Sequence, residues 1–485
     1  MSETHAETVA YVRDTMLPEA APPANQTGVV RWLRENLFSG FFNTILTLIG
    51  VAIIWFLVSH FGGWFMRSVW NADSIAQCRQ IVAERWGQGE TGACFAVIRV
   101  WWKQFMFGFY PASEYWRPVA ALALLMLALA PILFSEARRL RWGILAVSTV
   151  VGFVLCGILG APDKALLVLA IVFVVVAALI EYQPGRALIY SALFPFIGIW
   201  LLWGGSIWTM VSLLFGVVLG LAVWRILGRF RVGIAAPILG LLVAVLWWYF
   251  LDHDAARDLQ NLLPAALPRV ESQAFGGFLL AITIGVSAIT LSLPLGIVLA
   301  LARNSKLPVV KTLAVIFIEF IRGVPLITLL FVAWLLLNYF LPAGTSFDIV
   351  LRVIIMVTFF ASAYVAEVIR GGLAALPKGQ YEAADSLGLD YWKAQRLIVL
   401  PQALKISIPG IVGTFIGMFK DTTLVAFVAL FDPLKQIPDA VRANFAWKGA
   451  YWEPYIFTAS IFFIICFSMS RYAMWLERQL KREHR

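Results

Sequence analysis

Long apolar stretches occupy most of the chain, and their hydrophobic residues are continuous rather than alternating with polar ones. The first extends from Phe41 to about Phe65. Six more are centred near Met126, Val151, Val172, Phe196, Val217 and Leu242, and five further stretches are Phe278–Ala302, Val309–Leu337, Ile349–Val368, Ile406–Leu430 and Pro454–Trp475. About 20 apolar residues span a bilayer as a helix, whereas a membrane barrel alternates. The pattern predicts an all-α polytopic membrane protein with about 12 transmembrane helices.

A polar segment, residues 377–401, separates the third and fourth of the last five stretches. Pro377 precedes a helix-prone run in which three residues fall on one face: Tyr381, Ala384 and Leu387. Gly388 is expected to break this helix, Asp390 to cap a second one, and Pro401 to stop it. The segment therefore predicts a short helix–Gly–helix elbow that faces water.

Such an elbow has two interpretations. It could dock rigidly into a cleft of another protein and transmit that protein's movements. It could also be an amphipathic loop at the membrane surface that has no partner. The pattern of polar and apolar residues alone leaves both interpretations open.

Composition agrees with the membrane assignment, since 61% of the 485 residues are hydrophobic and only 14% are charged. The net charge of +10 is explained by membrane orientation rather than by a nucleic-acid partner, because basic residues collect in short loops that stay inside the cell. Four such loops lie at residues 138–141, 225–231, 303–306 and 370–396. With twelve spans, all four fall on the same side if both termini are cytoplasmic, so helix parity and charge agree.

The four cysteines divide into two groups. Cys78 and Cys94 lie in the long polar loop after the first span, which this topology places outside the cytoplasm. They form either a disulfide, which would stabilise the loop by about 3 kcal/mol, or two free thiols. Cys156 and Cys466 lie in apolar stretches and are expected to be small core residues.

The elbow carries a family motif. Glu382, Ala383, Ala384, Gly388, Ile398, Leu400 and Pro401 stand at the spacing of the EAA motif, so the chain resembles the permeases of ABC importers. Three further stretches resemble the polar and amino-acid branch of that family: 320–326, 362–372 and 419–424. Residues 43–47, 92–94 and 110–111 resemble the M-type permease subunit of the general L-amino-acid transporter (the Aap/Bzt group). The match is tight from about Gly276 onward and poor from Arg138 to Tyr249, so the role of those extra helices stays open.

The resemblance implies a set of partners and roles. The last five helices would form a type I ABC importer core that pairs with a second, related permease subunit. Two copies of a separate ATPase, which would bind ATP and Mg, would dock on the EAA loops through the seven motif residues. A periplasmic binding protein would deliver an L-amino acid for transport across the inner membrane.

Two observations bear on the energy source. The chain has no Gly-Lys pair and hence no phosphate-binding loop of the Walker type, so no catalytic residues and no cofactor are expected in it. Its four histidines, at positions 5, 60, 253 and 484, show no metal-binding spacing. An alternative to the ABC importer is an ion-gradient-driven secondary transporter using Glu319, Glu367 and Asp421, but the internal repeat expected of that class is not evident.

Charged residues near or inside the last five stretches are candidates for a translocation pathway. Glu319 and Arg322 are three residues apart, so they form either a gate or a structural pair on one helix. Glu367 and Arg370 repeat this spacing one turn before the polar segment, where a structural pair is favoured.

Four consecutive polar residues interrupt a later stretch: Lys420, Asp421, Thr422 and Thr423. They could line a path for a zwitterion, whose ammonium group needs a carboxylate and whose carboxylate needs a cation or an N–H group. They could instead form hydrogen bonds between helices. Ser362 and Tyr364 are weaker candidates of the same kind.

Topology and resemblance together divide the chain into six parts. These are a cytoplasmic tail (1–40), the first transmembrane helix (41–66), a periplasmic loop (67–117), accessory transmembrane helices (118–251), a second periplasmic loop (252–273) and an ABC transmembrane type-1 permease core (274–485) with the EAA loop at 377–401.

Overall fold

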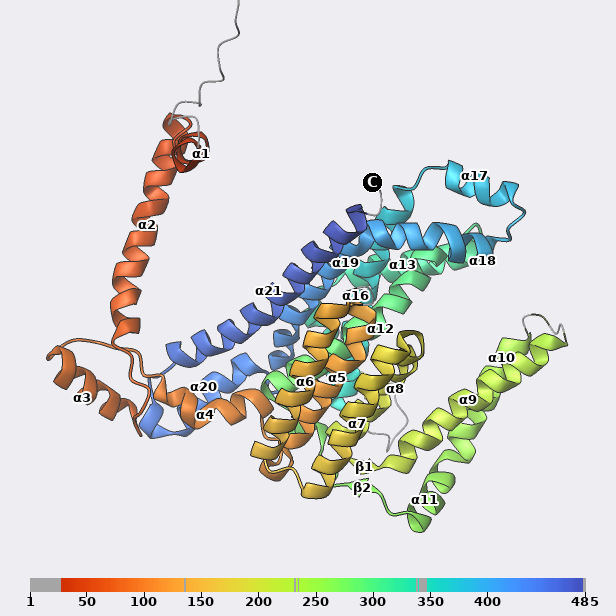
Figure 1. Ribbon diagram of the computed structural model, residues 1–485, viewed down its shortest axis with the longest axis horizontal. Helices are drawn as coiled ribbons and strands as arrows, with labels where there is room; N and C mark the ends of the chain where they lie inside the picture. The colour runs from red at the N-terminus through yellow and green to blue at the C-terminus, as the bar shows by residue number, and fades with distance from the viewer. Residues whose placement is uncertain are drawn as a thin grey trace, which may run out of the picture. The chain divides into compact units, whose positions relative to one another are not determined.

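The computed structural model describes residues 28–134, 137–230, 233, 235–336, 339 and 347–482, and most of them are helical (Figure 1). Internal contacts divide the chain into two compact units, Met1–Ala96 and Val97–Arg485. The predicted all-α class is confirmed. The description that follows takes each unit by itself.

The part of the first unit that the structure describes, from residue 28 onward, contains three helices. α1 (Gly28–Asn36) precedes α2 (Phe41–Met66), which is long and apolar enough to cross a membrane. Every residue of α2 is at least partly exposed, as expected for a helix whose sides contact lipid. α3 (Ile75–Trp86) begins at Ser74, whose hydroxyl accepts a hydrogen bond from the Gln77 N–H and caps the helix.

A disulfide joins α3 to the chain after it. Cys78 and Cys94 are bonded, their Cα atoms are 5.9 Å apart, and both side chains are buried. Beside them the ring of Trp70 stacks on Phe95 with centroids 4.7 Å apart. Covalent and aromatic contacts together stabilise a segment that contains only one short helix.

The second unit opens with α4 (Ala96–Phe107) and a group of accessory helices. α5 (Trp116–Leu133), α6 (Arg138–Ile158), α7 (Asp163–Tyr182) and α8 (Pro184–Trp203) pack on one another around a shared apolar cluster. α5 also reaches the last helix of the chain, because the Tyr472 hydroxyl donates to the Leu133 carbonyl at 2.9 Å. The accessory helices are therefore packed against the C-terminal part of the unit.

Arg117 ties the first turn of α5 to two other segments. It is completely buried, and its guanidinium donates to the Leu201 carbonyl at 2.6 Å and to the Pro268 carbonyl at 2.9 Å. Leu201 belongs to the last turn of α8, whose carbonyls have no partners within the helix. One buried cation thus satisfies backbone groups from two distant parts of the sequence.

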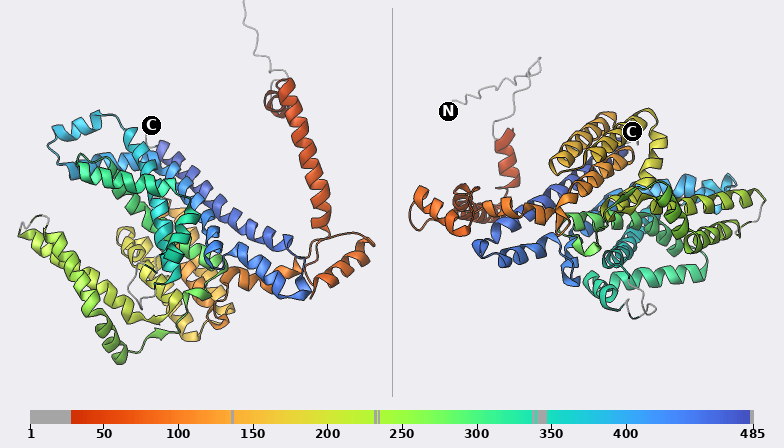
Figure 2. Two further views of the ribbon diagram at one scale, coloured as in Figure 1. Left: turned by 180° about the vertical axis from the view of Figure 1, so that it is seen from behind. Right: turned by 90° about the horizontal axis from the view of Figure 1, so that it is seen from below.

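Next in the chain is a helical hairpin whose two helices contact each other through small residues. α9 (Ile207–Arg229) and α10 (Ala235–Phe250) run side by side in Figures 1 and 2. A Cβ at Gly220 would lie 2.7 Å from the Gly240 carbonyl oxygen, so glycine permits this close approach. α11 (Asp252–Leu262) ends the hairpin, and β1 (Gly205–Ser206) pairs antiparallel with β2 (Ala266–Leu267) at its base.

The C-terminal core contains the remaining helices. Its long members are α12 (Gly277–Arg303), α13 (Pro308–Gly323), α16 (Ile349–Ala374), α19 (Leu400–Asp421) and α21 (Trp452–Arg482), and its shorter elements are η3 (Ser272–Ala274), α14 (Leu326–Phe331), η4 (Val332–Leu336), α17 (Gly379–Ser386), α18 (Tyr391–Ala394), η5 (Gln395–Val399), η6 (Thr422–Val428), α20 (Pro433–Ala443) and η7 (Phe445–Trp447).

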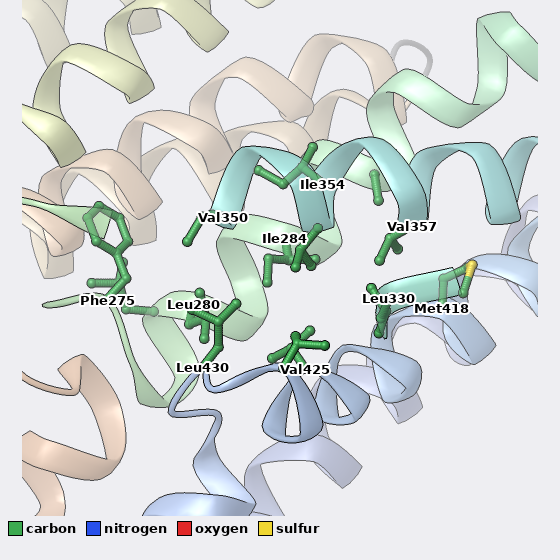
Figure 3. Packing of buried hydrophobic residues seen from close by; sticks show 14 of the residues in the cluster. Phe275, Leu280, Ile284, Leu330, Val350, Ile354, Val357, Met418, Val425 and Leu430 are labelled. Carbon is green, nitrogen blue, oxygen red and sulfur yellow. The ribbon is translucent and has the colours of Figure 1, made fainter. Parts of the chain in front are cut away.

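The core is filled by apolar side chains from several of these helices. α12 packs most extensively on α16, and α16 packs on α19. Figure 3 shows Ile284 of α12, Val357 of α16 and Val425 of η6 turned toward one another. Met418 and Leu330 join the same cluster, so α14 and α19 share one interior with α12 and α16.

The predicted count of 12 spans is not confirmed. Among the described residues, nine helices are long and apolar enough to cross a membrane, or up to eleven if each of two bent pairs is one span. The predicted span Val309–Leu337 is not one straight helix, because the chain bends by 102° between α13 and α14. Pro325 explains the break, since proline disfavours helical geometry at the preceding Val324, which is extended.

Candidate functional site

The polar segment folds as a helix–Gly–helix elbow, which lies beyond the packed ends of α16 and α19 in Figures 1 and 2. α17 forms its first arm, and the chain turns at Gly388, where φ is +66°. The Gly388 N–H donates to the Asp385 carbonyl at 2.9 Å, which closes the helix. Apart from Gly388 itself and its two chain neighbours, no described atom lies within 4 Å of the place that a Gly388 Cβ would take, so glycine is favoured here for backbone conformation and not for space.

Asp390 begins the second arm. Its carboxylate accepts the Lys393 N–H at 2.9 Å, and this hydrogen bond lowers the pKa of the Asp390 carboxyl. The prediction that Pro401 stops this arm is wrong, because α18 continues through the π-helical turn η5 directly into α19. A π-helical turn shifts the hydrogen-bond ladder by one residue, and Pro401 then falls in the first turn of α19, where proline is tolerated.

The inner face of the elbow packs on the core. Ala384 and Val399 are fully buried, and Tyr381 is half-buried against the cluster that contains Leu373 of α16. Burial raises the pKa of the Tyr381 phenol. The prediction that Leu387 shares this face is wrong: it is 72% exposed, because the chain leaves helical geometry just before Gly388.

The outer face of the elbow is exposed and partly apolar. Trp392 is 71% exposed, and Glu382, Ala383, Leu387 and Tyr391 are exposed as well. The Gln402 amide donates to Gln380 at 2.9 Å and to the Ile398 carbonyl at 3.0 Å, which joins the two arms behind this face. Exposed aromatic and aliphatic groups on a braced surface are typical of a protein–protein contact.

Ile398, Leu400 and Pro401 of the motif occupy the junction of the elbow with α19. Ile398 and Leu400 are half-buried, and Pro401 is exposed. These three residues lie where the second arm continues into α19, whereas Glu382 and Ala383 are exposed on the first arm.

The two predicted charge pairs belong to one larger group. Five side chains form a charge cluster between the ends of α12, α13 and α16: Arg303, Glu319, Arg322, Glu367 and Arg370. Glu367 and Arg370 form the expected pair at 2.6 Å. Glu319 and Arg322 are 4.0 Å apart, whereas Glu319 lies 2.8 Å from Arg303. From the sequence, Arg303 is expected only as a loop charge, because no short-range spacing reveals its two carboxylate partners.

The polar run Lys420–Thr423 lies where α19 ends and η6 begins, and its threonine hydroxyls bond to carbonyls of α19. Thr422 is fully buried and its hydroxyl donates to the Phe419 carbonyl at 2.7 Å, while the Thr423 hydroxyl donates to the Lys420 carbonyl at 2.9 Å. Lys420 is exposed and Asp421 is half-buried. The threonine hydroxyls thus serve their own helix, and the pathway role of these four residues stays a prediction.

The side chains of Ser362 and Tyr364, both on α16, have different surroundings. Ser362 is fully buried and donates to the Phe359 carbonyl at 2.8 Å. The Tyr364 ring lies 5.6 Å from the guanidinium carbon of Arg322, so it borders the charge cluster. Tyr364 is therefore placed near charge, while Ser362 is bonded within α16.

Asp432 is a buried carboxylate that sequence reasoning missed. It lies between the candidate spans, caps α20 by accepting the Leu434 and Lys435 N–H groups at 3.0 Å, and is completely buried. Burial raises its pKa from 3.8 to about 6 despite these hydrogen bonds. The sequence signal was the Asp-Pro pair that often begins a helix.

Stability should therefore depend on pH through Asp432. Between its unfolded pKa of 3.8 and its folded pKa of about 6, the folded protein binds a proton that the unfolded chain releases. Stability is expected to rise as the pH falls through this window, by at most about 3 kcal/mol. Asp432→Asn keeps a capping oxygen without the charge and should abolish this contribution. Thermal unfolding in detergent checks this, and an unchanged pH dependence in Asp432→Asn would contradict it.

The described residues hold no group of three or more His, Cys, Asp or Glu side chains that could bind a metal ion. The candidate residues gather in two other arrangements, the elbow and the charge cluster. The first offers a contact surface and the second offers exchangeable ion pairs.

Comparisons with known proteins point in one direction. Residues 292–482 match the family model of the binding-protein-dependent transport system inner membrane component. The chain is 55% identical to the glutamate/glutamine/aspartate/asparagine transport system permease protein BztC of Rhodobacter capsulatus, over 98% of this chain and 99% of that protein. It is 36% identical to the inner membrane amino-acid ABC transporter permease protein YhdY of Escherichia coli, over 94% of each chain.

A solved structure is also similar. The crystal structure of an amino acid ABC transporter with histidines shares 32% sequence identity, with a TM-score of 0.37, over 41% of this chain and 90% of that chain. The two relatives that match almost the whole chain are amino-acid transport permeases, and neither supports the ion-gradient alternative.

Proposed function

Because the chain belongs to the family of amino-acid ABC transporter permeases, we propose that it is a non-catalytic membrane subunit that couples through its elbow to a separate ATPase. The observation that carries this is the exposed outer face of the elbow, braced from behind by Tyr381, Ala384 and Val399. Because the elbow is packed firmly on the core, movement of a docked partner would be transmitted to α16 and α19, the helices that hold the elbow. ATP and Mg belong to the partner chain.

The proposed assembly contains a second permease subunit, two ATPase subunits and a periplasmic binding protein. Both termini and the elbow lie in the cytoplasm, as the basic loops favour. Closure of the ATPase dimer moves the two elbows, and the core helices then switch between inward-facing and outward-facing states. Substrate moves from the periplasm to the cytoplasm across the inner membrane.

The proposed substrates are acidic L-amino acids and their amides. The support is the name of the relative that is 55% identical over almost the whole chain. Neither the Lys420–Thr423 run nor the charge cluster by itself distinguishes among amino acids. Selection by the binding protein is therefore part of the proposal.

Purification of the chain together with its neighbouring subunits tests the function. We expect an ATPase to co-purify, and its activity in proteoliposomes to rise when the binding protein is loaded with glutamate, glutamine, aspartate or asparagine. Leucine and lysine serve as comparison substrates. Transport by the isolated chain in ATP-free vesicles, or a co-purified ATPase indifferent to every amino acid, would overturn the proposal.

A further inference from the structure

Glu367 is the hub of the charge cluster. One carboxylate oxygen accepts hydrogen bonds from Arg370 at 2.6 and 2.8 Å, and the other lies 3.3 Å from Arg303 and 3.8 Å from Arg322. Arg370 is on the same helix, whereas Arg303 ends α12 and Arg322 is in the last turn of α13. A single carboxylate therefore connects three helices.

α13 contacts the core mainly through its last turns. Ile318 and Ile321 are buried against α16, whereas Val309, Leu313 and Ile316, which lie earlier in the helix, are exposed. Immediately after these turns the helix breaks and the chain bends by 102°. The charge cluster thus holds the C-terminal end of α13, next to the bend between α13 and α14. A small rotation of α13 at this end would displace the rest of the helix.

The same part of α16 supports the elbow. Ile369 and Leu373, on either side of Arg370, belong to the cluster that contains Val399 and receives Tyr381. A displacement of the elbow therefore reaches Glu367 through one continuous helix and its packed side chains. No flexible segment intervenes between Glu367 and Leu373, because α16 extends to Ala374.

The ionic links are suited to breaking and re-forming. Between 21% and 52% of each side chain is exposed, and partly exposed ion pairs are individually weak. Arg303 already has two carboxylates within reach, Glu319 on α13 and Glu367 on α16. Arg303 can exchange the carboxylate of Glu367 for that of Glu319 without leaving its own charge unpaired. The C-terminal dipoles of α12 and α13 also favour the positive charges of Arg303 and Arg322, which lie in the last turns of these helices.

We propose that Glu367 is a positioning residue for coupled transport. Its links to Arg303 and Arg322 form an ionic lock that holds α13 against α12 and α16 in the conformation described here. The transport cycle opens this lock when the elbow moves, while the Glu367–Arg370 pair within α16 stays intact. This inference rests on the proposed coupling through the elbow and adds the residues that relay it.

The test uses the complete reconstituted complex and compares its basal ATPase activity with the activity stimulated by loaded binding protein. Glu367→Gln keeps the side chain's shape and removes the charge. We expect the stimulated-to-basal ratio to fall by about fivefold, mainly because basal activity rises. Arg303→Gln should have the same effect, and the double variant should add little, because both changes remove the Arg303–Glu367 contact.

Glu181→Gln is the matched control. Glu181 is also a half-buried carboxylate between two arginines, accepting from Arg138 at 2.8 Å and lying 3.7 Å from Arg141, but it belongs to the accessory helices. The stimulated-to-basal ATPase ratio of the Glu181→Gln complex should stay near that of the wild-type complex. A Glu367→Gln complex with lower thermal stability but an unchanged ratio would overturn the lock, leaving a structural ion pair. A wild-type complex without any stimulation would instead overturn the proposed function itself.

Discussion

Replacing Gly388 with valine is expected to lower ATP-coupled uptake by about tenfold or more while the chain still inserts into the membrane. Gly388 has a φ of +66°, a conformation that β-branched residues strongly disfavour. The space around its Cβ position is open, so the added side chain strains the backbone without colliding with anything described. The elbow should turn differently, and its outer face should no longer match the partner.

Uptake and ATP hydrolysis, measured together in proteoliposomes, check this result. Gly379→Val is the control within the same elbow, because Gly379 also has open space but an ordinary φ. That control should remain coupled. Wild-type uptake by Gly388→Val would remove the coupling role from the elbow.

Replacing Arg117 with leucine is expected to destabilise the protein by about 3 kcal/mol or more. The change leaves the Leu201 and Pro268 carbonyls without their buried donor. It also removes the cation that faces the Tyr110 ring at 5.8 Å. α5, α8 and the strand segment near Pro268 would lose their common contact.

Thermal unfolding of the purified chain in detergent measures this loss. Arg257→Leu is the comparison, because Arg257 forms only an exposed pair with Asp254, and it should change stability by about 0.5 kcal/mol or less. Arg117→Lys should fall between the two, since lysine keeps the charge but lacks the planar fork of donors. Equal stability of Arg117→Leu and the wild type would show that the buried hydrogen bonds contribute little.

Local features of the sequence predicted local structure well. The apolar run from Phe41 became α2, Asp390 became the cap of the second arm, and Gly388 ended the first arm. Each depends on a few neighbouring residues, whose conformational preferences act wherever the chain places them. The α-helical class followed from the length of the runs, since the membrane leaves few other structures open to them.

Contacts between distant residues could not be predicted in the same way. Arg303 meets Glu367 across 64 positions of sequence, and Arg117 meets Leu201 across 84, so no short spacing marks either contact. These partners depend on how the helices pack. Two prolines differed from expectation for another reason: Pro325 bends the predicted span Val309–Leu337, and Pro401 does not stop the second arm. Proline disrupts a helix where its missing N–H would have formed a hydrogen bond within the helix. In the first turn of a helix no such bond is formed, so proline is tolerated there.

The π-helical turn η5 keeps the elbow in phase with the helix that follows. Ala394 and Val399 are both buried although five positions separate them, a spacing that would place them on different sides of a regular α-helix. A π-helical turn corresponds to an α-helix that has absorbed one extra residue. Deleting one residue within Gln395–Val399 would therefore restore a regular α-helix at this junction without rotating the elbow. The direction in which the elbow points does not depend on whether the junction contains this extra residue.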